Sequence, residues 1–407
     1  MIYLDNAATT QMDERVLKAM VPYLITEYGN AGTLYKFGRT ANAAVRKART
    51  QVASLLHATS EQIIFTSGGS EANSLVFGGL KDYLKHIGKT HILVSAIEHD
   101  SVLRAAESLI KDGFYVEYLL PHRDGTVSAQ DVESAITPET GLISVMYANN
   151  ETGAINPANE IGAICMKRGI LFHTDCVQAA GCHSIDVEEI GCDFLSVSSH
   201  KIHGPKGVGA LFARDKSVLT PVIFGGAEQE FGLRAGTENV AGIVGFGAAC
   251  EISAKCLHED CTWVSTLKQR FYMALIEVLQ KNGYKDIVRT NGPSVLTPGK
   301  TLNLRLCGID GQTLLLMLDG KDICISAGSA CNSHEAKPSH VLTAMGLTED
   351  EARSSVRISF SRMNTADEVV DAANTIASCI EILANEVTRY RWEDSQRTFR
   401  RRDFRGS

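Results

Sequence analysis

The stretch FLSVSSHKIHGPKG, residues 194–207, decides the fold of this chain. Its first five residues form an apolar run with strand-like composition, and polar side chains begin where that run ends. In an open α/β sheet, ligands bind beyond the carboxyl ends of the strands, so we expect Lys201 at a sheet edge beside a ligand cleft. Partial desolvation there would lower the pKa of the lysine and suit its amine to Schiff-base chemistry.

Short apolar runs alternate with amphipathic stretches on both sides of this segment, from about residue 60 to 215. The apolar runs are Gln62–Thr66, His91–Ala96, Leu142–Tyr147, Ile170–Thr174 and Phe194–Ser198. Helical spacing lies between them, as in Glu71–His86 and Ser101–Lys111. This alternation predicts an α/β fold in which a mostly parallel sheet is flanked by helices.

The later part of the chain predicts a smaller α+β domain. One long helix is expected over 260–285, followed by strands at Thr301–Leu306, Ile323–Ser326 and Ser355–Ser359 and helices near Leu342–Met345 and Ala366–Val387. The N-terminal strand is assigned to the same domain, because the turn Asp5–Thr9 cannot extend the earlier alternation. We therefore predict a large domain over 15–259 and a small domain over 1–14 and 260–388.

Residues 389–407 form a basic tail, with seven arginines against three acids between Arg389 and Arg405. We interpret the tail as a solvated, poorly ordered extension, with a docking segment as the alternative. The whole chain carries a net charge of −7, which argues against a general nucleic-acid-binding surface.

Composition also bears on the compartment and on metals. No apolar run approaches the length of a bilayer span, and the N-terminus has no basic region typical of a signal peptide, so a cytoplasmic location without membrane contact is expected. Eleven cysteines without a CxxC pair are typical of reduced thiols, most of them small buried apolar residues. No metal site is predicted.

Polar residues follow nearly every strand of the predicted sheet. Gly69 and Ser70 open a helix, where free backbone N–H groups attract an anion. His99, Asn150 and Asp175 follow other strands, and each has an ordinary alternative as a cap or turn residue. Together, however, a strand-end aspartate, a strand-end lysine and a glycine-rich anion turn are the parts that pyridoxal 5′-phosphate (PLP) requires, so we predict this cofactor.

The motifs of the chain resemble those of the class V aminotransferase group of fold-type I PLP enzymes. Within that group, the chain is similar to the cysteine desulfurases of the nitrogenase-associated and iron–sulfur-cluster type. The matching stretches are YLDNAATT (3–10), TSGGSEAN (66–73), EHDSV (98–102), ANNETG (148–153), HTDCVQAAG (173–181), SSHKIHGPKGVGAL (198–211), RAGTENV (234–240), SAGSAC (326–331) and SVRIS (355–359).

The resemblance implies a role for each matching residue. Lys201 would form the Schiff base, His99 would stack on the cofactor ring and shuttle protons, and Cys331 would receive sulfur from L-cysteine. The remaining cofactor contacts would come from Gly69, Ser70, Asp175, Gln178, Ser198 and His200, joined by Thr237 from the second subunit of a homodimer. Asn150 and Arg357 would hold the substrate carboxylate, since a guanidinium suits that anion.

Two stretches depart from the family pattern: Ser70-Glu71-Ala72-Asn73 at the anion turn, and the charged residues after Cys331. The expected reaction gives L-alanine and a persulfide that passes to an acceptor protein in iron–sulfur assembly, tRNA thiolation or DNA sulfuration. A selenocysteine lyase is the nearest alternative, because it can also carry a cysteine. A sulfur-delivery platform with weak basal activity is another, and the basic tail and residues 332–337 favour it.

Overall fold

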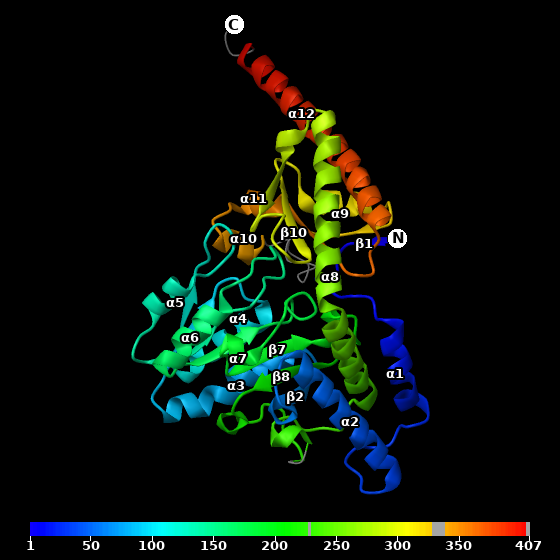
Figure 1. The fold of residues 1–407 in the computed structure, drawn as a ribbon. Coiled ribbons are helices and arrows are strands. Elements are labelled where there is room, and N and C mark those ends of the chain that lie inside the picture. Colours follow the sequence, from blue (N-terminus) through cyan, green and yellow to red (C-terminus); the bar gives the residue numbers. More distant parts are fainter. Residues whose placement is uncertain (227–228, 328–337, 404–407) are drawn as a thin grey trace.

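The computed structural model describes residues 1–226, 229–327 and 338–403. A large layered body contains the first half of the chain, and a smaller one rests above it in the orientation of Figure 1. A long helix, α8 (Val240–Lys281), runs through both bodies. The division into domains at 259/260 thus stays a prediction, since one helix continues through that point.

The large body is built on a seven-stranded sheet with the order β2-β8-β7-β6-β5-β3-β4. The strands are β2 (Ile63–Thr66), β3 (His91–Ser95), β4 (Tyr115–Leu119), β5 (Thr140–Ser144), β6 (Leu171–Asp175), β7 (Phe194–Ser198) and β8 (Gly209–Ala213). Neighbours from β4 to β7 pair in parallel, and β8 is antiparallel to both β7 and β2. Strands β2, β3, β5, β6 and β7 therefore end at the same edge, as the mostly parallel prediction requires.

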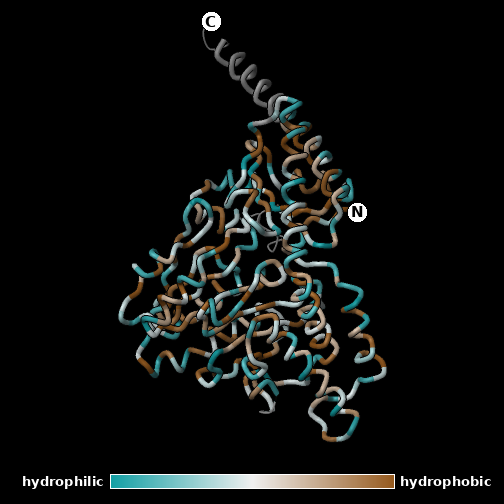
Figure 2. The backbone as a smooth tube through the Cα atoms, in the orientation of Figure 1, coloured by the Kyte–Doolittle hydropathy of each residue, from teal (hydrophilic) through white to brown (hydrophobic). Residues whose placement is uncertain are grey.

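Helices cover both faces of this sheet. Alternate strand residues point to opposite faces, so Leu93 joins the cluster under α2, α6 and α8 while Ile92 joins the cluster under α3 and α4. The helices of this body are α1 (Glu14–Ile25), α2 (Lys36–Leu55), α3 (Gly69–His86), α4 (Asp100–Ser108), α5 (Ala129–Ala135), α6 (Ala158–Arg168) and α7 (Val187–Ile190). Hydrophobic segments gather among the strands and the helices that cover them (Figure 2).

The small body holds an antiparallel sheet of order β12-β13-β10-β9 and a separate parallel pair, β1-β11. Its strands are β1 (Ile2–Tyr3), β9 (Val288–Asn291), β10 (Thr301–Leu306), β11 (Ile323–Cys324), β12 (Ser326–Ala327) and β13 (Ser355–Ser359). Its helices are α9 (Gly311–Asp319), α10 (His340–Ala344), α11 (Glu349–Arg353) and α12 (Ala366–Asp403). The N-terminal strand thus pairs with residues more than 300 positions later.

Two helices differ from the sequence prediction. Helix α8 begins 20 residues before the expected start at 260, and α12 continues as helix to Asp403 where a poorly ordered tail was expected. Among the described residues, α8 alone is long and apolar enough to cross a membrane, contrary to the expectation from the apolar runs. Half of its most apolar window is buried inside the protein, against α1, α2 and α12, which is typical of a core helix.

Candidate functional site

Lys201 lies in a single turn of 3₁₀-helix directly after β7, at the carboxyl edge of the large sheet. Its Nζ donates to the carbonyl oxygens of Ala7 and Ala8 at 2.6 and 2.7 Å. Burial lowers the pKa of Lys201 to about 7, with smaller contributions from the positive charges of Lys300 and Arg357. Near neutral pH a large share of this amine is therefore unprotonated, as a nucleophilic lysine requires.

Asp175 and Gln178 lie beside this amine, at the end of β6 and just after it. Asp175 is 4% exposed and accepts from the backbone N–H of Val177 and from Asn73 Nδ2, both at 2.9 Å. Gln178 Nε2 donates to Ala7 O at 2.9 Å, the carbonyl that Lys201 also contacts. The N-terminal turn, β6 and β7 thus bring Lys201, Asp175 and Gln178 together, as the sequence predicted.

The predicted anion turn lies between β2 and α3. Helix α3 begins at Gly69 without a side-chain cap, so its first N–H groups remain available at the positive end of the helix dipole. A Cβ at Gly69 would lie 2.7 Å from Val177 Cγ2 and 3.8 Å from the Cβ of the buried Ser198. A Cβ at this position would therefore force Val177 or the turn to shift, and Ser70 stays exposed beside it.

His200 lies in the turn that carries Lys201 and contacts the N-terminal segment. Its Nδ1 is 3.1 Å from Thr9 Oγ1, and its backbone oxygen accepts from the N–H of Thr10 at 2.9 Å. Burial lowers the pKa of His200 to about 4, with a smaller contribution from the charge of Lys201. The ring is therefore neutral at physiological pH and acts as a hydrogen-bonding group rather than a cation.

His99 caps the N-terminus of α4 and has an exposed ring. Its Nδ1 accepts from the backbone N–H of Ser101 at 3.1 Å, so a neutral ring carries its proton on Nε2. Asn73 Nδ2 donates to Ser101 Oγ at 2.9 Å and also to Asp175, which joins His99 to Asp175 through one network. His99, Ser70 and Ser101 line an open depression of about 570 Å³.

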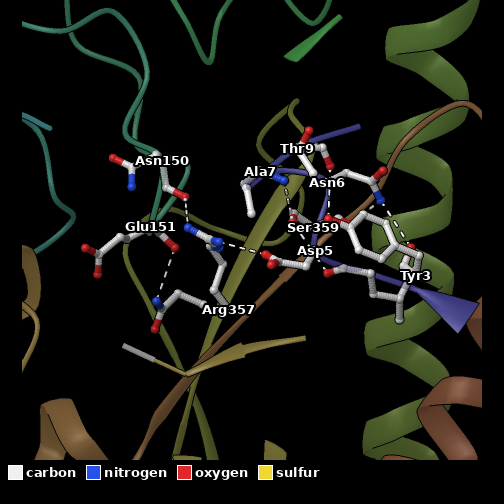
Figure 3. Close-up of polar contacts among 12 residues, drawn as sticks. Tyr3, Asp5, Asn6, Ala7, Thr9, Asn150, Glu151, Arg357 and Ser359 are labelled. Carbon is white, nitrogen blue, oxygen red and sulfur yellow. Dashed lines mark hydrogen bonds and ion pairs between the residues drawn. The ribbon is translucent and has the colours of Figure 1, made fainter. Parts of the chain in front are cut away.

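Arg357 and Asn150 meet on the small-body side of the site (Figure 3). Arg357 lies on β13 and is 7% exposed. Its Nη2 donates to Asp5 Oδ1 at 2.7 Å and its Nη1 to the backbone oxygen of Asn150 at 3.2 Å. Its Nε is buried without a partner among the described residues, so the guanidinium keeps donors available for a further anion.

Two predicted site residues are not brought into this constellation. Thr237 lies in the exposed segment before α8, and no hydrogen bond joins its side chain to another residue of the described chain. Its predicted contact across a subunit interface stays a prediction. Cys331 lies outside the described residues, as do its neighbours from 328 to 337.

Three buried groups of the site were not singled out from the sequence: Asn73, Glu98 and Lys300. Asn73 lies in the stretch that departs from the family pattern, and its side chain holds Asp175. Burial raises the pKa of Glu98 well above its usual range, and the nearby charge of Asp175 adds to this effect. Lys300 precedes β10 and has no motif around it, so no signal in the sequence identified it.

Comparisons with known proteins identify the family of this chain. Residues 2–371 match the family "Aminotransferase class-V". A putative cysteine desulfurase IscS 1 of Bacillus subtilis is 42% identical over 383 residues, covering 94% of this chain and 99% of the relative. A solved NifS-like protein superposes with a TM-score of 0.85 at 33% identity, covering 94% of this chain and all of that one.

A second solved structure, described as SspA in complex with cysteine, superposes with a TM-score of 0.76 at 35% identity, covering 90% of this chain and all of that one. These similarities extend over nearly the whole chain and not over one motif. The fold described above agrees with them. The chain belongs to the class V aminotransferase family and, within it, to the cysteine desulfurases.

Proposed function

We propose that this protein is a PLP-dependent cysteine desulfurase that converts L-cysteine to L-alanine and transfers the sulfur to Cys331 as a persulfide. The observation that supports this proposal best is the convergence of Lys201, Asp175 and the free N-terminus of α3 at one sheet edge. The cysteine desulfurase relatives and the cysteine bound to SspA support the choice of substrate.

The residues present fit PLP. The cradle of Gly69, Ser70, Ser198 and His200 suits a phosphate, because it offers backbone N–H groups, hydroxyls and a neutral imidazole. Asp175 would pair with the pyridine nitrogen, and Gln178 would donate from its side-chain amide N–H to the phenolic oxygen of the ring. Thr237 of a second subunit would complete the phosphate contacts.

PLP, when bound, supplies an electron sink for the charge that remains when an amino acid loses its α-proton. The proton would pass to Lys201 Nζ, or to His99 as the alternative base. Lys201 suits this task because its lowered pKa, about 7, lets it accept and release a proton near neutral pH. The exposed ring of His99 would stack on the cofactor.

Arg357 would bind the carboxylate of cysteine together with Asn150. Asp5 holds the guanidinium from one side, which limits its side-chain freedom before the substrate arrives. The unpaired Nε and the remaining Nη hydrogens stay available for the carboxylate. The side-chain amide of Asn150 would contribute a neutral donor, since only its backbone oxygen is used by Arg357.

Cys331 would act as a thiolate, because the thiolate is the nucleophilic form of cysteine. A sulfur–sulfur bond forms as the Cβ–S bond of the substrate breaks, and its electron pair stays with the carbon, which takes up a proton to become the methyl group of alanine. L-cysteine and the Cys331 thiol thus yield alanine and a persulfide, without an added oxidant or reductant. An acceptor protein would then receive the terminal sulfur.

We further propose a homodimer in the cytoplasm. Thr237 favours the dimer, because its exposed hydroxyl has no partner within the described part of its own chain. A net charge of −7 makes an acceptor protein a better partner than a nucleic acid.

The first test compares wild type with Cys331→Ser. Alanine and sulfide release from L-cysteine would be measured with a thiol reductant present, together with the visible absorbance of bound PLP. We expect the variant to keep the absorbance and to lose at least about 100-fold in sulfide release, because its alcohol cannot accept sulfur. Lys201→Ala should lose both signals.

Each outcome has a definite reading. Normal turnover by Cys331→Ser would remove that residue from the proposed sulfur path and leave a PLP lyase that releases sulfur without Cys331. A wild-type protein that releases alanine only when an acceptor protein is present would favour the delivery-platform alternative.

A further inference from the structure

A small cavity lies beside Lys201. Its volume is about 30 Å³, enough for a single water-sized occupant. It lies between the loops after β6 and β7, helix α8 and the segment after β13. Among the predicted site residues it shares only Lys201, since Asp175, Gln178, Ser198 and Arg357 lie outside its lining.

The lining of this cavity contains four basic residues, although burial lowers the pKa of Lys201 to about 7 and that of His203 to about 4. Lys201, His203, Lys300 and Arg362 contribute to it, and Asp260 is its one acidic residue. Asp260 accepts from Arg362 Nη1 at 2.9 Å, and Arg362 Nη2 donates to Asp13 at 2.8 Å. The carboxylate within the cavity is therefore already paired with a guanidinium.

Lys300 is the group that this arrangement leaves uncompensated. Its side chain is 6% exposed, and its Nζ is buried without a hydrogen-bond partner in the described part of the chain. The other buried lysine nearby, Lys268, differs because its Nζ donates to Thr297 O at 2.5 Å. A buried ammonium without a partner is costly, so a counter-ion is the expected remedy.

We propose that this cavity binds one small monovalent inorganic anion, of the size of chloride, against the ammonium of Lys300. The small volume favours a small ion over an organic acid. An open depression of about 630 Å³ shares Asp260 and Arg362 with the cavity, so the cavity lies close to the protein surface.

Occupancy of this site would bear on the neighbouring amine. Burial is the largest cause of the lowered pKa of Lys201, His200, His203 and His183, and the charge of Lys300 is a smaller cause in each case. An anion beside Lys300 would offset that charge and raise the pKa of Lys201. Through this site, the concentration of the anion would change the fraction of Lys201 that is protonated. This proposal does not depend on which reaction the enzyme catalyses.

Thermal unfolding of the full-length PLP-loaded protein tests the proposal. The melting temperature would be followed as sodium chloride replaces sodium gluconate at constant ionic strength, for wild type, Lys300→Met and Lys206→Met. Lys206→Met is the matched control, because Lys206 is an exposed lysine of the neighbouring loop. Wild type and Lys206→Met should show a saturable rise of about 1–3 °C, and Lys300→Met should show none.

An equal rise in Lys300→Met, or no rise in wild type, would overturn the proposal. Wild-type crystals soaked in bromide give a second measurement that does not depend on how well the variant folds. An anomalous peak against Lys300 Nζ would support the site, and an occupant without anomalous signal would identify it as water and overturn the proposal.

Discussion

The pKa of Lys201 links its chemistry to the stability of the PLP-free protein. The folded protein holds this amine at a pKa of about 7, against 10.5 for an ordinary lysine. Between these two values the unfolded chain binds more protons than the folded chain, so stability rises with pH across this window. The loss of folding stability caused by burying this amine is greatest below about pH 7 and disappears above about pH 10.5.

Lys201→Met should remove this dependence. For the PLP-free proteins, we subtract the free energy of unfolding of wild type from that of the variant. This difference should be about 2–4 kcal/mol more positive at pH 7 than at pH 10. Urea unfolding of both proteins at pH 7 and at pH 10 measures this difference. The comparison between pH values matters, because the variant also loses the hydrogen bonds to Ala7 and Ala8 at every pH. Lys206→Met is the control, and a pH-independent difference for Lys201→Met would contradict the assigned pKa.

Residues whose roles follow from the end of a strand could be predicted from the sequence. Lys201 and Asp175 each terminate an apolar run, and the edge of the sheet brings them together. Asn73, Glu98 and Lys300 could not be predicted in this way. Their roles depend on side chains 28 to 102 positions away or on burial between the two bodies, and periodicity carries no information about either.

At the scale of elements, the start of α3 depends on one close contact. Gly69→Ala would place a methyl group 2.7 Å from Val177 Cγ2, so the first turn of the helix or Val177 must shift. We expect a loss of about 1–2 kcal/mol in stability and roughly a 10-fold weaker PLP affinity, because the shift misdirects the helix N–H groups. Absorbance titration of PLP-free protein with PLP measures the affinity.

A second substitution separates this contact from a general helix effect. Gly69→Ala combined with Val177→Ala should recover most of the affinity, because the second change removes the clashing methyl group. Gly320→Ala is the matched control, since its added Cβ would meet Met317 O only at 3.6 Å. If the double variant binds PLP no better than Gly69→Ala, the contact with Val177 is not the cause.

Most of the strands that build the site were predicted to within a few residues, since their buried apolar runs contrast with their polar ends. Two strands of the sheet were missed for physical reasons. Strand β4 is an edge strand with exposed residues such as Tyr115, and β8 begins with Gly209, where an added Cβ would lie only 2.8 Å from Gly68. The early start of α8 was missed because its first turns are rich in glycine and alanine, which weakens helical periodicity.

At the scale of the whole molecule, the two bodies build the site jointly. The N-terminal segment leaves the small body at β1 and supplies Ala7 and Ala8 to Lys201, while Asp5 holds Arg357 on β13. The catalytic edge of the large sheet and the predicted carboxylate site of the small body are therefore tied to the same turn. No single element contains this site, which is why only the order of motifs along the chain predicted it.

The predicted contribution of Thr237 from a second subunit extends this reasoning beyond one chain. Thr237→Val changes an exposed side chain, so the fold should keep its stability to within about 0.5 kcal/mol. The loss of one phosphate hydrogen bond should weaken PLP binding about 10-fold. Equilibrium titration with PLP, and light scattering for the oligomeric state, measure both quantities.

Mixed dimers decide whether the hydroxyl acts across the interface. A dimer of one Lys201→Ala subunit and one Thr237→Val subunit contains one site with Lys201 intact and a wild-type Thr237 opposite it. That site should bind PLP with wild-type affinity and show its visible absorbance, because each subunit supplies what the other lacks. If Thr237 acts within its own chain instead, the only site with Lys201 keeps the substitution, and its PLP affinity stays about 10-fold weak.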